Sequence, residues 1–202
     1  MAVKFICCYF GRSTYQFPLD EAWEFGAETT RKIRETIVGD CGLADDDGSV
    51  LAQTVKNAGD GDYLELGSFY GASGILASLT KKEYGIKGDV YCVDDLSGIV
   101  PRSPADIMKN AEKMDASIIL KVAKTSPLPF RKPFNCVFID AGHDIASVFE
   151  DWLNVRKVAT RYVVFHDYSA ASLGVMAVVR QADFWPVHIS AHMAVLENPT
   201  WL

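Results

Sequence analysis

The feature that most constrains the fold is an alternation of short apolar segments with longer amphipathic ones, which begins at Gly61. The short segments are nearly all apolar, as strands covered on both faces must be. They are Tyr63–Leu66, Val90–Val93, Ser117–Val122, Cys136–Ile139 and Tyr162–Phe165. The segments predicted as helices are Ala72–Lys82, Pro104–Met114, Ile145–Lys157 and Ala170–Gln181. Strands that alternate with helices imply right-handed crossovers and therefore predict a parallel sheet.

The end of the chain departs from this alternation. Trp185–Ser190 and Met193–Glu197 read as two strands joined only by Ala191–His192, and a link that short permits only an antiparallel pair. We therefore expect an α/β protein: a Rossmann-like three-layer sandwich with a mostly parallel seven-stranded sheet that ends in a C-terminal antiparallel hairpin.

The N-terminal part is expected to be helical. Helical spacing of apolar residues predicts helices over Leu19–Val38 and Ser49–Ala58. The acidic run Asp45–Gly48 between them is typical of a solvent-exposed turn, with a cation site as the less favoured alternative. The length predicts one domain over residues 1–202, in which residues 1–59 form a helical extension or cap on a core of residues 60–202.

Composition narrows the class of partner and compartment. The net charge of −6 disfavours binding to a phosphate backbone, so nucleic acid is not expected as a partner. No apolar stretch approaches the ~20 residues of a membrane-spanning helix. The five cysteines form no CxxC pair, and Cys92 and Cys136 fall in predicted strands as small core residues. We expect a cytoplasmic protein without membrane contact.

Candidate ligand-binding residues follow the first two strands. In open parallel sheets, ligands bind beyond the carboxyl ends of the strands. Glu65 is followed by Gly67, Ser68 and Gly71, a loop that lets the chain turn sharply and a ligand approach the backbone. It matches neither the dinucleotide nor the phosphate-loop pattern. Asp94 ends the second strand, where a carboxylate can accept hydrogen bonds from ribose hydroxyls or cap the next segment.

Acidic and imidazole groups follow the next two strands of the core. Asp140 and Asp167 end neighbouring strands, which lie ~4.8 Å apart, so both can face one divalent cation. His143 suits a general base, because the ordinary pKa of histidine is about 6.5. His166 is expected to orient Asp167. Surface or cross-strand packing is expected for the remaining histidines, His188 and His192.

The segment from about Asp60 to Gln181 resembles class I S-adenosylmethionine-dependent methyltransferases. Ile139–His143 and Phe165–Tyr168 are similar to a metal-dependent branch whose members modify hydroxyls of sugars and other small molecules. The resemblance implies that His143 is the catalytic base and that Asp140 and Asp167 bind the metal, Mg²⁺ or another divalent cation. It implies S-adenosylmethionine as cofactor, held by Glu65, Gly67, Ser68, Gly71, Asp94 and Asp140.

Two positions depart from that pattern. Gly142 stands where the family often has a second acid. Lys124–Ser126 follow the third strand, where the family often has an acid near the adenine, and this leaves Ser126 or a backbone amide for that role.

The expected function is S-adenosylmethionine-dependent methylation of a small-molecule or sugar hydroxyl. One alternative is a catalytically silent protein that binds the same cofactor. A nicotinamide-dependent oxidoreductase is a second, which the glycine spacing and the terminal hairpin disfavour. A methyltransferase for nucleic acid or protein is a third, which the net charge disfavours for nucleic acid. A homo-oligomer is left open.

Overall fold

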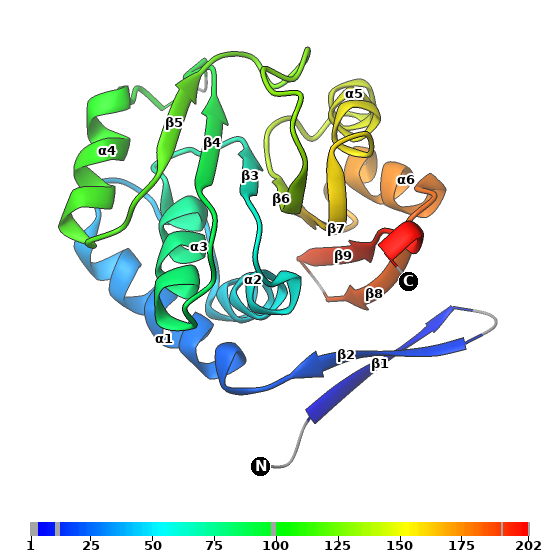
Figure 1. The fold of residues 1–202 in the computed structure, drawn as a ribbon. Coiled ribbons are helices and arrows are strands. Elements are labelled where there is room, and N and C mark those ends of the chain that lie inside the picture. Colours follow the sequence, from blue (N-terminus) through cyan, green and yellow to red (C-terminus); the bar gives the residue numbers. More distant parts are fainter. Residues whose placement is uncertain (1–3, 11–12, 98–99, 191, 202) are drawn as a thin grey trace.

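A seven-stranded sheet forms the centre of this computed structural model, which describes residues 4–10, 13–97, 100–190 and 192–201 (Figure 1). The strand order is β5-β4-β3-β6-β7-β9-β8. The five parallel strands are β3 (Tyr63–Leu66), β4 (Val90–Asp94), β5 (Ile119–Val122), β6 (Phe134–Ile139) and β7 (Ala159–His166). The chain runs outward from β3 in both directions, so the strand order reverses between β3 and β6, where such sheets bind ligands.

The predicted C-terminal hairpin is confirmed. Strands β8 (Trp185–Ile189) and β9 (Met193–Glu197) pair antiparallel, and β9 also pairs antiparallel with β7. Ala191, in the link between them, lies outside the described residues. His188 of β8 is buried and packs edge-on against Trp23, so it is a core residue and not part of the surface.

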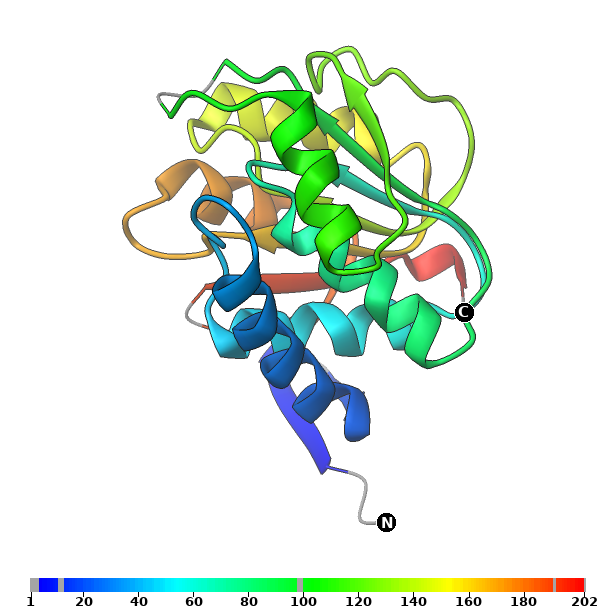
Figure 2. The same cartoon turned by 90° about the vertical axis from the view of Figure 1, so that its left-hand side faces the viewer.

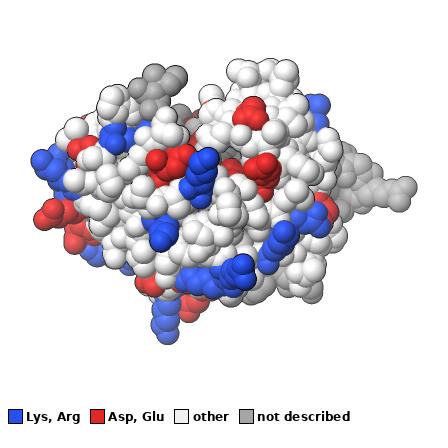
Figure 3. Space-filling model, turned by 90° about the horizontal axis from the view of Figure 1, so that it is seen from above, with Lys and Arg blue, Asp and Glu red and all other residues white. Residues whose placement is uncertain are grey.

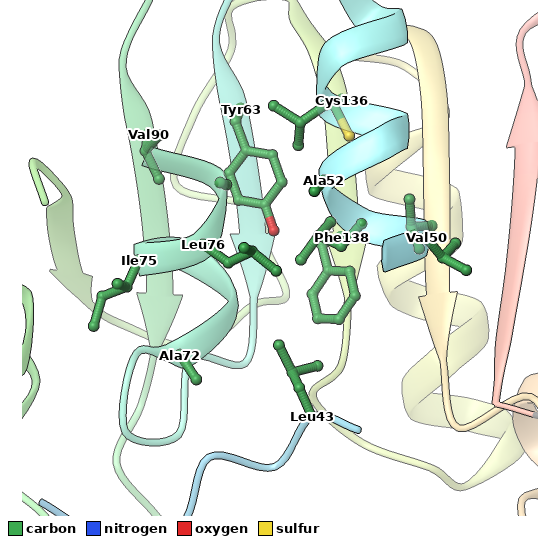
Figure 4. Packing of buried hydrophobic residues seen from close by; sticks show 14 of the residues in the cluster. Leu43, Val50, Ala52, Tyr63, Ala72, Ile75, Leu76, Val90, Cys136 and Phe138 are labelled. Atoms are coloured by element: carbon green, nitrogen blue, oxygen red, sulfur yellow. The ribbon is translucent and has the colours of Figure 1, made fainter. Parts of the chain in front are cut away.

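Helices cover both faces of the sheet, as the alternation predicted. One face packs against α1 (Glu21–Thr36), α2 (Asp45–Ala58), α3 (Ala72–Glu83) and α4 (Pro104–Lys113). The other packs against α5 (Ile145–Val155) and α6 (Leu173–Gln181). Successive strand residues point to opposite faces. Tyr63 therefore joins Leu76 and Phe138 on the α2–α3 side (Figure 4), whereas Leu64 joins the core under α5 and α6.

The extension of residues 1–59, expected to be helical, is not helical at residues 4–10 and 13–19. β1 (Lys4–Phe10) and β2 (Ser13–Leu19) pair antiparallel in a separate two-stranded sheet that projects from the main body (Figures 1 and 2). Two apolar runs separated by Gly11–Arg12 are a hairpin signal that a closer reading of the sequence would use. Residues 21–36 and 45–58 do form helices, and these share a core with the main sheet.

The acidic run also differs from the prediction. It starts α2 one turn earlier than expected and is no exposed turn: Asp47 is buried, and its Oδ2 accepts a hydrogen bond from the Ala44 backbone at 3.0 Å. Carboxylates in the first turn of a helix are favourable because they face the positive end of its dipole. Asp45 pairs with Arg31 and Arg34, two cations of α1.

None of the described helices is both long and apolar enough to span a lipid bilayer. Cys92 and Cys136 are buried and free, in agreement with their prediction as core residues.

Candidate active site

A cavity of about 910 Å³ opens at the carboxyl ends of the parallel strands. Its volume lies within the range usual for small-molecule sites. Seen from above, the molecule is notched between two raised parts, and this face carries side chains of both charges (Figure 3). The loops after β3, β4, β5, β6 and β7 and the helix α5 contribute to the wall. The predicted site residues among its lining are Gly67, Ser68, Asp94, Asp140, His143 and Asp167.

The glycine loop after β3 lies tight against the loop after β6. Gly67 has a φ of +88°, and a Cβ placed there would lie 2.2 Å from the carbonyl oxygen of Asp140. Only glycine fits this position, so the backbone itself forms the cavity wall. Gly71 also has a positive φ, but it begins α3 and packs near Ile107 and is not among the described residues that line the cavity.

Glu65 is fully buried behind this loop and does not line the cavity. The Tyr63 hydroxyl donates to its Oε2 at 3.3 Å, and its Oε1 has no hydrogen-bond partner among the described residues. Burial raises the pKa of this carboxyl to about 7. A buried acceptor without a donor fits a nearby cationic ligand group, such as an amine.

Asp94 shapes the glycine loop. It is 4% exposed, and its Oδ2 accepts the backbone N–H groups of Ser68 and Phe69, each at 2.9 Å. Its Oδ1 accepts from the Leu96 backbone at 2.7 Å and from Arg102 Nη2 at 2.9 Å. The capping role that the sequence allowed is therefore present, and the ribose contact stays a prediction.

Backbone strain is concentrated in the loops around the cavity. Phe69, Leu96 and Asp167 follow β3, β4 and β7, and all three adopt left-handed φ values between +47° and +61°. Such conformations cost roughly 1–3 kcal/mol each and tend to occur at functional sites. The rest of the fold therefore holds these loops in a shape that the local sequence does not favour.

The structure brings the predicted metal and base residues together. Ligand atoms of Asp140, His166 and Asp167 lie within 4.8 Å of one another, close enough for one ion. His143 Nε2 lies 3.1 Å from Asp167 Oδ2 and 3.6 Å from Asp140 Oδ1. Two carboxylates and an imidazole suit a divalent cation that accepts oxygen and nitrogen ligands.

His166 occupies a different place from the one predicted. Its Nδ1 lies 3.1 Å from Asp140 Oδ1 but 3.7 Å from Asp167 Oδ1, so its closer partner is Asp140. On its other side, Nε2 lies 3.5 Å from Asp47 Oδ2. Asp47 belongs to α2, and no sequence signal linked it to the site, because only the packing of α2 on the sheet makes the contact.

The cluster shifts the acid–base properties of its members. Burial opposes charge on Asp140, but the neighbouring imidazoles of His143 and His166 outweigh it and lower the pKa of this carboxyl. The nearby Asp140 carboxylate raises the pKa of His143. Burial alone would lower the pKa of His166, yet Asp140 and Asp47 raise it to about 10. Without a metal, both imidazoles are stabilised in the charged form that balances the carboxylates.

The surroundings of Gly142 and of Lys124–Ser126, the two departures from the family pattern, are defined by contacts with α5. A Cβ on Gly142 would lie 2.6 Å from the Cβ of Ser147, so a side chain cannot be added there without movement. Beside Lys124–Ser126, helix α5 supplies a buried carboxyl that the sequence did not single out, Asp151, to the cavity wall.

Solved structures similar to this one include three O-methyltransferases. The O-methyltransferase TomG of Streptomyces achromogenes, in complex with S-adenosylmethionine, has a TM-score of 0.57 at 16% identity over 89% of this chain and 90% of its own. CalS11, a TDP-rhamnose 3'-O-methyltransferase, has a TM-score of 0.57 at 14% identity over 74% of this chain and 76% of its own. The Bacillus cereus O-methyltransferase in complex with S-adenosylhomocysteine has a TM-score of 0.53 at 14% identity over 90% of this chain and 92% of its own.

Identities this low establish the fold alone. No curated protein sequence matches the chain significantly. A family model described as a methyltransferase domain, in contrast, matches residues 64–168, from β3 to the loop after β7, and thus more than half of the chain. This match includes the glycine loop, His143 and the two carboxylates predicted to bind metal, and the chain therefore belongs to the methyltransferase domain family.

Proposed function

We propose that this protein is an S-adenosylmethionine-dependent O-methyltransferase that acts on a hydroxyl of a small molecule or sugar. The observation that carries the proposal is one cavity lined by both the glycine loop and the cluster of Asp140, His143 and Asp167. Structural neighbours that methylate oxygen, one of them on TDP-rhamnose, support the reaction class.

The cofactor would supply a methyl group already activated on a sulfonium. The backbone at Gly67 lets a ligand lie directly against the sheet edge, since no side chain intervenes. Glu65 lies fully buried behind this loop, and its carboxyl would favour a cationic group of the cofactor bound on the other side of the loop. These residues would mainly hold the methyl group and the acceptor in line, which is the largest task in this reaction.

Asp140, Asp167 and His166 would hold a divalent cation, which lowers the pKa of a bound hydroxyl. His143 is the accessible imidazole of the cluster: its side chain is 45% exposed, against 7% for His166. His143 can therefore meet an acceptor hydroxyl in the cavity and take its proton at Nδ1, while Asp167 Oδ2, 3.1 Å from Nε2, stabilises the imidazolium.

Calorimetric titration with S-adenosylmethionine and S-adenosylhomocysteine, with and without Mg²⁺, tests the cofactor. We expect micromolar binding that is lost in Gly67→Arg, a variant whose folding is checked by circular dichroism. In His143→Ala, binding should persist while turnover falls by roughly 10²–10⁴-fold. Full turnover in a folded His143→Ala variant would disprove the base assignment.

The same titrations separate the alternatives. Cofactor binding without turnover over a panel of phenols, catechols and nucleotide sugars would favour the catalytically silent protein. Binding of NAD(H) in place of both cofactor forms would favour the oxidoreductase.

A further inference from the structure

The loop after β5 contributes Lys124, Thr125 and Ser126 to the cavity wall and no acidic residue. Strands β3, β4 and β5 lie side by side in that order, so a nucleoside laid from the glycine loop across Asp94 brings its base to Lys124–Ser126. Lysine, threonine and serine side chains offer no carboxylate to an amino group on that base.

Helix α5 brings a carboxyl to this place from elsewhere in the chain. Asp151 lines the cavity together with Thr125 and Ser126 and is 1% exposed. Its Oδ2 has no hydrogen-bond partner among the described residues. The same helix holds the loop, since Asn154 Nδ2 donates to Ser126 Oγ at 3.2 Å.

An acceptor in this state is unfavourable without a ligand. Burial raises the pKa of Asp151 to about 6, although the Thr125 hydroxyl acts in the opposite direction. Leaving a buried polar group unpaired is unfavourable, and more so when the group is charged. A ligand that donates a hydrogen bond at this point would remove that cost.

We propose that Asp151 recognises the adenine of the cofactor by accepting a hydrogen bond from its exocyclic amine. The carboxyl that is missing after β5 is thus replaced by one from α5, and Asp151 selects adenine over bases without that amine. This inference rests on the proposed cofactor and concerns binding, not the methyl-transfer step. An oxo group at the same position of the base is itself a hydrogen-bond acceptor, so it cannot pair with the Asp151 carboxylate, and both oxygens stay unpaired.

The test compares calorimetric binding of S-adenosylhomocysteine with that of S-inosylhomocysteine, in which the amine is replaced by oxygen. Wild-type protein should bind the adenine form roughly 10–100-fold more tightly. Asp151→Asn can donate to oxygen and should reduce or reverse this preference. Asp46→Asn makes the same change at an exposed acid of α2 that is not among the residues lining the cavity, and this control should keep the wild-type preference.

The outcomes distinguish this inference from the proposed function. If wild-type protein binds S-adenosylhomocysteine but shows no preference over the inosine form, the inference fails while the cofactor stands. The inference also fails if folded Asp151→Asn retains the wild-type preference. If wild-type protein binds neither compound, the proposed cofactor fails and the inference with it. The wild-type comparison needs no variant, so it decides even if Asp151→Asn does not fold.

Discussion

Gly67 lies where the loops after β3 and β6 come closest, and the conflict there involves main-chain atoms that cannot move aside. A methyl group would meet the Asp140 carbonyl oxygen at 2.2 Å, and φ is +88°. We expect Gly67→Ala to lower the free energy of unfolding by about 2–4 kcal/mol, through left-handed strain and overpacking together. Gly85→Ala is the control: its φ is also positive but nothing lies within 4 Å of the added Cβ, so only the strain should remain. If urea denaturation gives the same loss in unfolding free energy for both variants, the close approach of Gly67 to Asp140 does not matter for stability.

His188 gives the molecule a sensitivity to acid that is independent of the active site. Burial lowers the pKa of this imidazole to about 4, so it stays neutral in the folded state at pH values where the unfolded chain takes up a proton. Stability from this group is full above the unfolded pKa and is lost as the pH falls toward the folded pKa. Between pH ~7 and pH ~5, this predicts a loss of about 2 kcal/mol.

The measurement is the free energy of unfolding in urea at both pH values, compared with His188→Phe, which retains an aromatic contact with Trp23. The loss should be smaller in this variant by about 2 kcal/mol. The exposed His192 serves as control, because His192→Phe should retain the wild-type loss. A His188→Phe variant with the wild-type pH dependence would refute the assignment.

At the scale of elements, the contact between α1 and α2 depends on glycines inside helices, where glycine is intrinsically unfavourable. A Cβ on Gly48 would lie 1.8 Å from Thr30 Oγ1, and one on Gly26 would lie 2.3 Å from the Gly48 carbonyl oxygen. Thr30 already donates to Gly26 across one helical turn at 2.8 Å. The two helices therefore approach at distances that no larger residue permits.

Gly48→Ala should destabilise the protein, although alanine favours helix by about 0.5–1 kcal/mol. We expect a net loss of roughly 1–2 kcal/mol in thermal or urea unfolding, because overpacking exceeds the gain in propensity. Glu28→Ala, at an exposed position of α1, should leave stability within about 0.5 kcal/mol of wild type. A stabilised Gly48→Ala variant would show that the helices can separate without cost.

In the molecule as a whole, helix α2 from the N-terminal part contacts the cluster of acidic and imidazole groups. Asp47 of α2 lies 3.5 Å from His166 Nε2, and His166 Nδ1 in turn lies 3.1 Å from Asp140. A carboxylate behind an imidazole ligand fixes its orientation and increases its basicity. Asp47 would thus act on the proposed metal through His166 and not by direct contact.

Asp47→Asn should therefore weaken binding of Mn²⁺ to the cofactor-free protein by about 10-fold, a typical loss for such an outer partner. Titration calorimetry or the EPR signal of free Mn²⁺ measures this directly. The adjacent Asp46 is exposed, so Asp46→Asn should bind Mn²⁺ like wild type. Equal affinities of the two variants would exclude the Asp47–His166 contact from metal binding.

The alternation of apolar and amphipathic segments is enough to predict the parallel sheet and the edge at which its polar residues gather. Apolar runs with helices between them require a parallel sheet, and that sheet gathers the ends of β3, β4, β6 and β7 at one edge, as observed. Glycine and acidic residues that directly follow the strands can therefore be identified from the sequence as candidates for a binding site. Their separate roles in holding cofactor, metal and proton stay predictions.

The residues that reach the site from other elements could not be predicted from the local sequence. Asp47 and Asp151 lie inside helices at no recognisable spacing from a strand end, and the packing of α2 and α5 on the sheet alone brings them there. The burial of His188 and the role of Asp94 in the glycine loop likewise depend on long-range contacts. Local conformational preferences depend on neighbours along the chain, whereas these contacts join residues that are far apart in the sequence.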